Sequence, residues 1–153
     1  RLDNRRGLQA RLEDLRGGEV VVMVDLDHFK RVNDTRGHAG GDAVLADFAD
    51  VVSTVLRGGD YAARYGGEEF LLVLVDTDLD GTVDVLARLR SAWAAVQPHI
   101  TFSSGYAVHE GGTSPALVTG AADGALYAAK RAGRNRDQPA AQAPELTPAA
   151  HVV

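Results

Sequence analysis

The chain has 153 residues, of which 45% are hydrophobic and 24% charged, so it can bury the core of one domain of ordinary size. Its formal net charge of −5 argues against the basic surface on which non-specific nucleic-acid binding depends. The absence of cysteine excludes a disulfide framework and a thiolate metal site.

The sequence carries no pattern typical of secretion or of a membrane span. Its apolar runs are shorter than the ~18–20 residues that a membrane span needs, and residues 1–16 are charged throughout. We therefore expect a cytoplasmic globular domain without direct membrane insertion, cut from a longer protein that is itself free to be attached to a membrane.

Apolar spacing and breaker residues predict alternating helices and strands. In chain order, we expect a helix over 4–15, a strand over 19–25, a short helix over 27–36, a long helix over 41–57, strands over 61–65 and 68–76, a helix over 79–96, a strand over 100–108 and a helix over 115–131. The inward stripe of the long helix is predicted to comprise Val44, Phe48, Val51, Val52 and Val55. That of the helix over 79–96 is predicted to comprise Val83, Leu86, Leu89 and Trp93.

The two strands over 61–65 and 68–76 are separated by Gly66-Gly67, which predicts a two-residue hairpin turn with both glycines at positive φ. Because this pair is antiparallel while the other strands alternate with helices, the fold class is an α/β chain forming an α+β sandwich of ferredoxin-like type. Residues 137–153 are rich in Ala and Pro without periodicity, and we expect them to form a disordered tail.

Two pairs of acidic residues stand at predicted strand ends. Asp25 and Asp27 close the first buried strand, and Glu68 and Glu69 follow the glycine pair. If the two strands are neighbours, Asp25 and Glu68 converge, and grouped carboxylates of this kind suit magnesium. The alternative is that strand-end acids are only solvated, and for a single Asp it is the favoured one.

Two further stretches contain groups that suit a nucleotide. Residues 28–30 (HFK) begin a helix, where free N–H groups and Lys30 favour an anion, although a merely solvated lysine explains this feature equally well. Asn33, His38 and Asp42 can contact a base and a sugar, and a carboxylate can accept two hydrogen bonds from a guanine edge. Helix capping by Asp42 and turn chemistry at the other two positions are the alternatives.

Five motifs in order give the chain a close resemblance to the GGDEF family of diguanylate cyclases. They are DLDHFK at 25–30, NDTRGHAGGD at 33–42, RYGGEEF at 64–70, TFSSG at 101–105 and ADGALYAAKRAGRNR at 122–136. Each motif alone is weak, but their order and spacing leave little room for chance. The resemblance assigns residues 1–136 to one such domain and implies a nucleotidyl-cyclase type, mostly antiparallel sheet of about five strands flanked by helices.

The resemblance also implies an activity, the condensation of two GTP molecules into cyclic di-GMP and two pyrophosphates. Two Mg²⁺ ions, for which Mn²⁺ can substitute, would be held by Asp25, the Leu26 carbonyl and Glu68, with Glu69 beside them. Glu68 and Asp25 would be the catalytic residues. Substrate binding would involve the guanine-binding Asn33 and Asp42, His38 near the sugar, and phosphate contacts from His28, Phe29, Lys30, Lys130 and Arg134. The phosphate contacts would use Lys30 and Lys130, the two lysines among 16 basic residues.

One domain holds one GTP, so the resemblance implies catalysis by a homodimer. It also implies product inhibition at a separate site formed by Arg57 and Asp60, which make an R-x-x-D sequence, with Arg88 on the following helix. The alternative is that Arg57 only closes a helix and Asp60 begins a strand.

The chain departs from the family at its start. The family's D-x-L-T-G before L-x-N-R-R is reduced here to Arg1 followed by LDNRR, so the leucine that helps to wall the guanine pocket is missing. We expect a parent protein with a regulatory domain.

Two rival functions remain open. One is a GGDEF module that senses cyclic di-GMP or GTP without cyclising, and the other is a different nucleotidyl cyclase or a polymerase palm. The intact signature acids argue against the first, and Asn33 with Asp42 and the GGEEF turn argues against the second.

Overall fold

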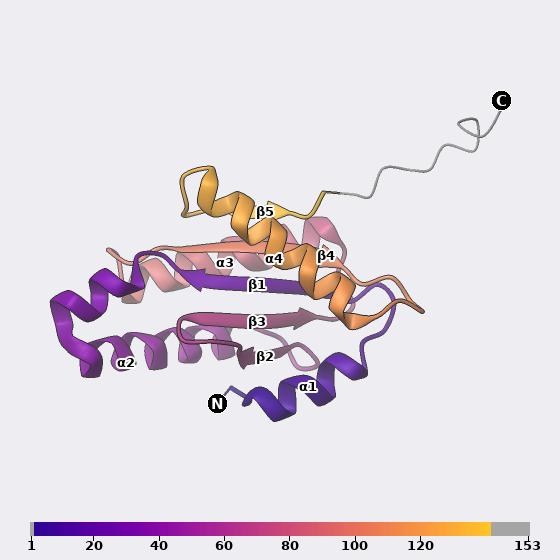
Figure 1. The fold of residues 1–153 in the computed structure, drawn as a ribbon, viewed down its shortest axis with the longest axis horizontal. Helices are drawn as coiled ribbons and strands as arrows, with labels where there is room; N and C mark the ends of the chain where they lie inside the picture. Colours follow the sequence, from indigo (N-terminus) through magenta and orange to yellow (C-terminus); the bar gives the residue numbers. More distant parts are fainter. Residues whose placement is uncertain (1, 142–153) are drawn as a thin grey trace.

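The computed structural model describes residues 2–141, which form a sheet covered by helices on both faces (Figure 1). The elements in chain order are α1 (Arg5–Glu13), β1 (Val20–Leu26), α2 (Phe29–Val55), β2 (Tyr61–Arg64), β3 (Glu69–Leu74), α3 (Leu79–Val96), β4 (Phe102–Val108), α4 (Pro115–Arg131) and β5 (Asp137–Pro139). Within these residues, no helix is long and apolar enough to cross a membrane.

The five strands lie in the order β2-β3-β1-β4-β5. All neighbours are antiparallel except β4 and β5, which are parallel. The strand at the centre of the sheet, β1, is buried along its whole length, as expected for an apolar run. The sheet therefore confirms the predicted mostly antiparallel α+β sandwich.

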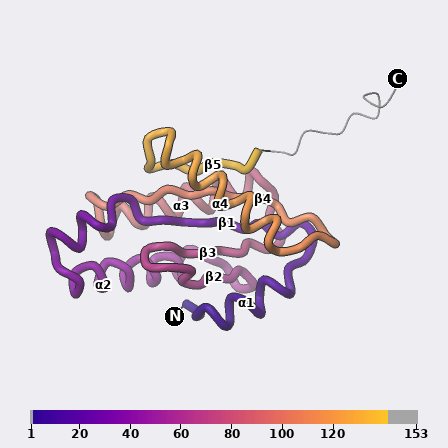
Figure 2. Tube along the Cα trace, viewed as in Figure 1, coloured from indigo at the N-terminus to yellow at the C-terminus, as the bar shows by residue number. Residues whose placement is uncertain are grey.

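Alternation along β1 divides the core into two layers. Val20, Val22 and Val24 face α2 and α3, whereas Val21 and Met23 face α1 and α4. Figure 2 shows the same arrangement, with the chain of α1 and α4 in front of the sheet and that of α2 and α3 behind it. Phe48 lies at the centre of the larger cluster, with ring centroids 4.9 Å from Phe70 and 5.0 Å from Trp93.

One prediction for the helices is confirmed and one is wrong. The two helices expected over 27–36 and 41–57 are present as two helical segments of α2, separated at Gly37, whose φ of 75° and ψ of 172° are non-helical. In α3, Val83 is 50% exposed, and Thr82 and Val85 are buried with Leu86, Leu89 and Trp93. The prediction was wrong only in the first turns of the helix, where Thr82 and Val85 pack inward and Val83 faces outward.

The predicted two-residue hairpin turn is also wrong. β2 ends at Arg64 and β3 begins at Glu69, and neither Gly66 nor Gly67 has positive φ. The Arg64 guanidinium donates hydrogen bonds to the carbonyls of Gly66 (3.2 Å) and Gly67 (2.6 Å), which stabilise a wider loop.

The start of the expected tail is ordered. Asp137–Pro139 form β5 against β4, a strand of three residues that is too short to leave a periodic pattern in the sequence. The rest of that predicted tail, residues 142–153, lies outside the described residues.

Candidate active site

The predicted acids meet at one end of the sheet. Asp25 of β1 is paired with Glu69 of β3, and the Leu26 N–H donates a 3.2 Å hydrogen bond to the Glu68 carbonyl. The two strands are therefore neighbours, as the convergence of Asp25 with Glu68 required. Figure 1 shows that the β2–β3 loop, the start of α2 and the loop between α4 and β5 gather at this same end of β1.

Asp25 is a buried carboxylate with one cationic neighbour. The residue is 4% exposed, and its Oδ2 contacts the ammonium group of Lys130. Burial raises the pKa of Asp25, and the hydrogen bond from Lys130 offsets this only in part. Burial disfavours the ionised form, and a cation bound beside Asp25 would favour it.

Glu68 and Glu69 are both half-buried in the loop and at the start of β3. Burial raises the pKa of Glu69, and the negative charge of Asp25 raises it further. The Glu69 carbonyl accepts hydrogen bonds from the N–H groups of Tyr65 (2.9 Å) and Gly66 (3.3 Å), which fix the loop. A Cβ at Gly66 would lie 3.0 Å from the Glu69 carboxylate, so glycine leaves room for that side chain.

The donors at this edge fit a hard cation. Asp25 and Glu68 supply carboxylates, and the Leu26 carbonyl points to the same side of β1 as its N–H, towards Glu68. Within residues 2–141, the backbone N–H of Glu68 does not donate a hydrogen bond back to the Leu26 carbonyl. The same residues contain no cluster of three or more His, Cys, Asp or Glu side chains suited to a metal, and the implied set has only two carboxylates with a carbonyl.

The start of α2 offers backbone donors beside these acids. His28 has a left-handed φ of 54° and makes no side-chain cap. Within the described chain, the N–H groups of Phe29 and Lys30 have no hydrogen-bond partner, and both Lys30 and His28 are exposed. A helix start with free N–H groups attracts an anion.

The predicted guanine-reading residues lie on α2. A Cβ at Gly41 would fall 1.9 Å from Oδ1 of Asn33, so the missing side chain lets the Asn33 amide lie against the helix one residue from Asp42. Asp42 is exposed and lies inside α2, so it is not an N-cap. His38 is exposed directly after the kink at Gly37. The kink thus folds the second half of α2 back over Asn33.

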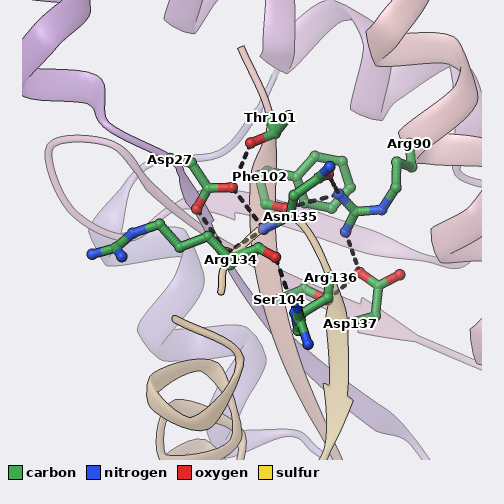
Figure 3. A network of polar contacts seen from close by, with 10 residues as sticks. Asp27, Arg90, Thr101, Phe102, Ser104, Arg134, Asn135, Arg136 and Asp137 are labelled. Carbon is green, nitrogen blue, oxygen red and sulfur yellow. Dashed lines mark hydrogen bonds and ion pairs between the residues drawn. The ribbon is translucent and has the colours of Figure 1, made fainter. Parts of the chain in front are cut away.

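The loop after α4 carries the other predicted phosphate ligand. Arg134 and Asn135 both have left-handed backbones, with φ of 64° and 49°, and the Arg134 N–H donates to the Ala129 carbonyl at 3.0 Å. The Arg134 side chain is exposed and points away from the polar network around Asn135 (Figure 3). It is therefore free to reach a ligand.

Asp27 has a role that the sequence did not reveal. Its carboxylate accepts hydrogen bonds from the hydroxyls of Thr101 and Ser103, both at 2.7 Å, and from the Asn135 N–H at 3.0 Å. The acid is thus fully engaged by the protein and joins β1, β4 and the loop after α4. The T-x-S spacing, which puts both hydroxyls on one face of a strand, was the only available signal.

Arg57 and Asp60 form a tight turn at the far side of β2. The Asp60 side chain is 1% exposed, and its oxygens accept from the N–H groups of Arg57 (3.1 Å) and Val75 (3.0 Å). The Arg57 side chain is 56% exposed and lines a cavity of ≈ 760 Å³ with Asn4 and Tyr61. Arg88 is exposed on α3. Asp60 therefore holds the turn, while the Arg57 side chain is exposed.

Comparison with known proteins decides the family. The model of the family "Diguanylate cyclase, GGDEF domain" matches residues 1–136. The chain belongs to the GGDEF family.

Individual relatives agree with this assignment. The diguanylate cyclase DgcP of Pseudomonas aeruginosa is 44% identical over 149 residues, which cover 88% of this chain but 22% of DgcP. The crystal structure of the diguanylate cyclase SiaD from the same species, in complex with its activator SiaC, is similar with a TM-score of 0.85 and 38% identity, covering 91% of this chain and 59% of SiaD.

A third similar protein was crystallised with a ligand. The GGDEF domain of DgcB from Caulobacter crescentus, in complex with c-di-GMP, has a TM-score of 0.81 and 34% identity, covering 90% of this chain and 91% of the solved domain. The GGDEF chain described here thus spans a small part of DgcP and nearly the whole of an isolated GGDEF domain.

Proposed function

We propose that this GGDEF domain is a diguanylate cyclase that condenses two GTP molecules into cyclic di-GMP with two bound Mg²⁺ ions. The observation that carries the proposal is the junction of β1 and β3. There a buried Asp25, the Leu26 carbonyl and Glu68 lie beside a helix start where, among the residues that the structure describes, two N–H groups have no partner. Cation ligands next to an anion site suit a metal-bound triphosphate.

Each half-reaction forms one ester bond and breaks one anhydride bond. The 3′-oxygen of one GTP attacks the α-phosphorus of the other, the bond to the β-phosphate bridge breaks, and pyrophosphate leaves. Glu68, a half-buried acid beside Asp25, would take the hydroxyl proton. Bound Mg²⁺ would supply Lewis-acid stabilisation of the attacking oxygen and the leaving group.

The remaining residues bind and orient the nucleotide. The N–H groups of Phe29 and Lys30, together with Lys130 and Arg134, would hold the phosphates. Lys130 would exchange its contact with Asp25 for a phosphate oxygen when the metal takes its place. Asn33 and Asp42, brought together by Gly41, would bind the guanine edge.

Because one domain supplies one GTP site, the complete reaction needs two domains facing each other. The rate per enzyme should therefore rise with enzyme concentration in the range where the dimer forms. A rate strictly proportional to enzyme, from a protein that light scattering shows to be monomeric, would contradict the half-site arrangement.

Product inhibition would act through Arg57. Its exposed guanidinium, fixed by the Asp60 turn, can bind a guanine edge or a phosphate of cyclic di-GMP, with Arg88 as a further contact. Arg57→Ala should keep cyclase activity and weaken product binding measured by calorimetry. Unchanged product affinity in this variant would exclude Arg57 from the site.

The deciding test of the activity is incubation with GTP and Mg²⁺, with products identified by mass spectrometry. Cyclic di-GMP and pyrophosphate in a 1:2 ratio are expected. Binding of cyclic di-GMP without any turnover, at enzyme concentrations where a dimer is present, would instead identify a binding module.

A further inference from the structure

A single arginine of α3 connects three segments behind the proposed phosphate site (Figure 3). Arg90 donates from Nη1 to the Phe102 carbonyl at 2.8 Å and to Oδ1 of Asn135 at 2.7 Å. Its Nη2 donates to Oδ1 of Asp137 at 2.6 Å. The guanidinium also lies over the Phe102 ring, 3.9 Å from its centroid. A planar group with this many fixed partners has one orientation.

The segment that Arg90 holds has an unfavourable backbone. Arg134 and Asn135 are consecutive non-glycine residues with positive φ. Asparagine visits this region readily, but arginine does not, so the Arg134 conformation persists because its surroundings impose it. The Asn135 N–H is held from the other side, by Asp27 at 3.0 Å and the Ser103 hydroxyl at 3.2 Å. Arg90 is the contact to the Asn135 side chain.

The end of the segment is fixed by the same arginine. Asp137 accepts from Arg90 and, at the same oxygen, from the Ser104 hydroxyl at 2.6 Å. The Ser104 N–H in turn donates to the Arg136 carbonyl at 2.9 Å. The chain after Arg134 is therefore anchored to β4 and α3, and the Arg134 N–H donates to the Ala129 carbonyl of α4, while the Arg134 side chain projects outwards (Figure 3).

We propose that Arg90 is a positioning residue for nucleotide binding, which holds the left-handed Arg134–Asn135 turn so that Arg134 meets the phosphates of GTP. This inference rests on the proposed function, since it assumes that Arg134 contacts the triphosphate. Without Arg90, Asn135 and Asp137 would lose their common partner, and the turn would relax towards ordinary φ values. Arg134 would then become ordered only when GTP binds, and the entropy lost in ordering it would weaken the affinity for GTP.

The proposal differs from a purely stabilising salt bridge in a way that can be measured. Arg90 and Asp137 have side chains 25% and 23% exposed, and Arg11 with Glu19, at 22% and 12%, forms a comparable pair on the opposite layer. Arg11→Met is therefore a matched control. It removes an arginine with two hydrogen bonds to a carboxylate but touches no part of the loop after α4.

The test is a double-mutant cycle in which the affinity for GTP is measured by calorimetry. Ca²⁺ replaces Mg²⁺ to prevent turnover. Arg90→Met should weaken GTP binding about tenfold, the size expected for losing one well-placed charged contact, whereas Arg11→Met should leave it unchanged. In the Arg134→Ala background, Arg90→Met should have little further effect, because the group that it positions is gone. Equal effects in both backgrounds would overturn the proposal.

Amide hydrogen exchange decides the case independently of the proposed function. In Arg90→Met the N–H groups of Arg134 and Asn135 should exchange faster, while those of β1 keep their protection. If wild-type protein fails to bind GTP, the proposed function fails, yet this readout still tests whether Arg90 orders the turn. Unchanged exchange at both amides would overturn that role. Arg90→Lys, which restores the charge but not the planar set of donors, should recover only part of the protection.

Discussion

Asp25 and Asp27 stand two residues apart at the same end of β1, and both lie on the side of the sheet that α4 covers. Both are buried, at 4% and 6% exposure. Asp27 accepts three hydrogen bonds, from two hydroxyls and one N–H group, and both of its carboxylate oxygens have protein donors. Among residues 2–141, the Asp25 carboxylate contacts only Lys130, and burial raises its pKa. The two buried carboxylates therefore differ in how many protein donors stabilise their charge.

This difference separates structural acids from acids available to a ligand. A buried carboxylate with a full set of donors belongs to the folded framework, because removing it leaves those donors unpaired. A buried carboxylate with a raised pKa lacks such compensation and would be stabilised by a cation. The sequence presents both as strand-end acids, and only their partners distinguish them. The predictions below test that distinction, from the largest expected effect to the smallest.

The largest effect should come from the Asp25 region. Glu68→Gln keeps the size of the side chain but removes the charge and the proton acceptor, so product formation should fall at least ~100-fold. The fold should persist, since Glu68 makes no side-chain hydrogen bond within the described residues. Product yield by mass spectrometry and the melting temperature check both halves. Full activity would remove Glu68 from the mechanism.

The second effect concerns stability and belongs to the Asp27 region. Asp27→Asn replaces a charged acceptor by an amide whose NH₂ group must face a donor, so the free energy of unfolding should fall by about 2–4 kcal/mol. Asp25→Asn, the matched change two residues away, should cost far less, because it removes a charge that burial already disfavours. Urea denaturation of the metal-free protein measures both. Equal losses would show that the two acids are not different in kind.

Regular elements were predicted well because their signals are local. The helices expected over 79–96 and 115–131 coincide with α3 and α4, whose apolar spacing and N-cap residues Asp78 and Ser114 are visible in the sequence. The predicted convergence of Asp25 with Glu68 depended on β1 and β3 being neighbours, and that condition is confirmed.

What escaped prediction depends on contacts between distant residues. Arg90 and Asn135 are 45 residues apart, and no pattern in either segment announces their 2.7 Å hydrogen bond. β5 owes its existence to pairing with β4, since three residues have no period of their own. The loop between β2 and β3 is not the two-residue turn that a glycine pair favours. Its conformation is stabilised by hydrogen bonds from the Arg64 side chain to two carbonyls.

The third prediction uses Lys130 to probe why Asp25 is available. In the free protein the Lys130 ammonium contacts the Asp25 carboxylate, so a divalent ion must displace it. Lys130→Met should therefore tighten Mn²⁺ binding to the nucleotide-free protein about tenfold, by the order of one lost charged contact, while weakening GTP binding. Electron paramagnetic resonance of free Mn²⁺ and calorimetry with GTP give the two readouts. Weaker binding of both would show that Lys130 does not compete with the metal.

The smallest expected effect is a pH dependence of stability with opposite signs in two parts of the molecule. Burial raises the pKa of Asp25, so between its ordinary value of 3.8 and the raised value the folded state binds more protons than the unfolded state. Stability attributable to this group therefore falls as pH rises through that window. Glu19 behaves in the reverse manner. Burial acts to raise its pKa, but hydrogen bonds from Arg11 and from the Arg16 N–H, with the positive charge of both arginines, lower it overall.

Because the pKa of Glu19 is lowered from 4.5, its contribution is present above that value and is lost as pH falls through the lowered one. The measurement is the difference in unfolding free energy between wild type and Asp25→Asn, and between wild type and Glu19→Gln, from pH 3 to 7 in the absence of metal. The Asp25 difference should move in favour of wild type on acidification, and the Glu19 difference should move against it. Adding Mn²⁺ should reduce the pH dependence of the Asp25 difference and leave that of the Glu19 difference unchanged. The reason is that a bound cation favours the ionised form of the Asp25 carboxylate. Two differences with the same sign would mean that Asp25, like Glu19 and Asp27, is already satisfied by its protein neighbours, and that its single contact with Lys130 suffices to stabilise the charge.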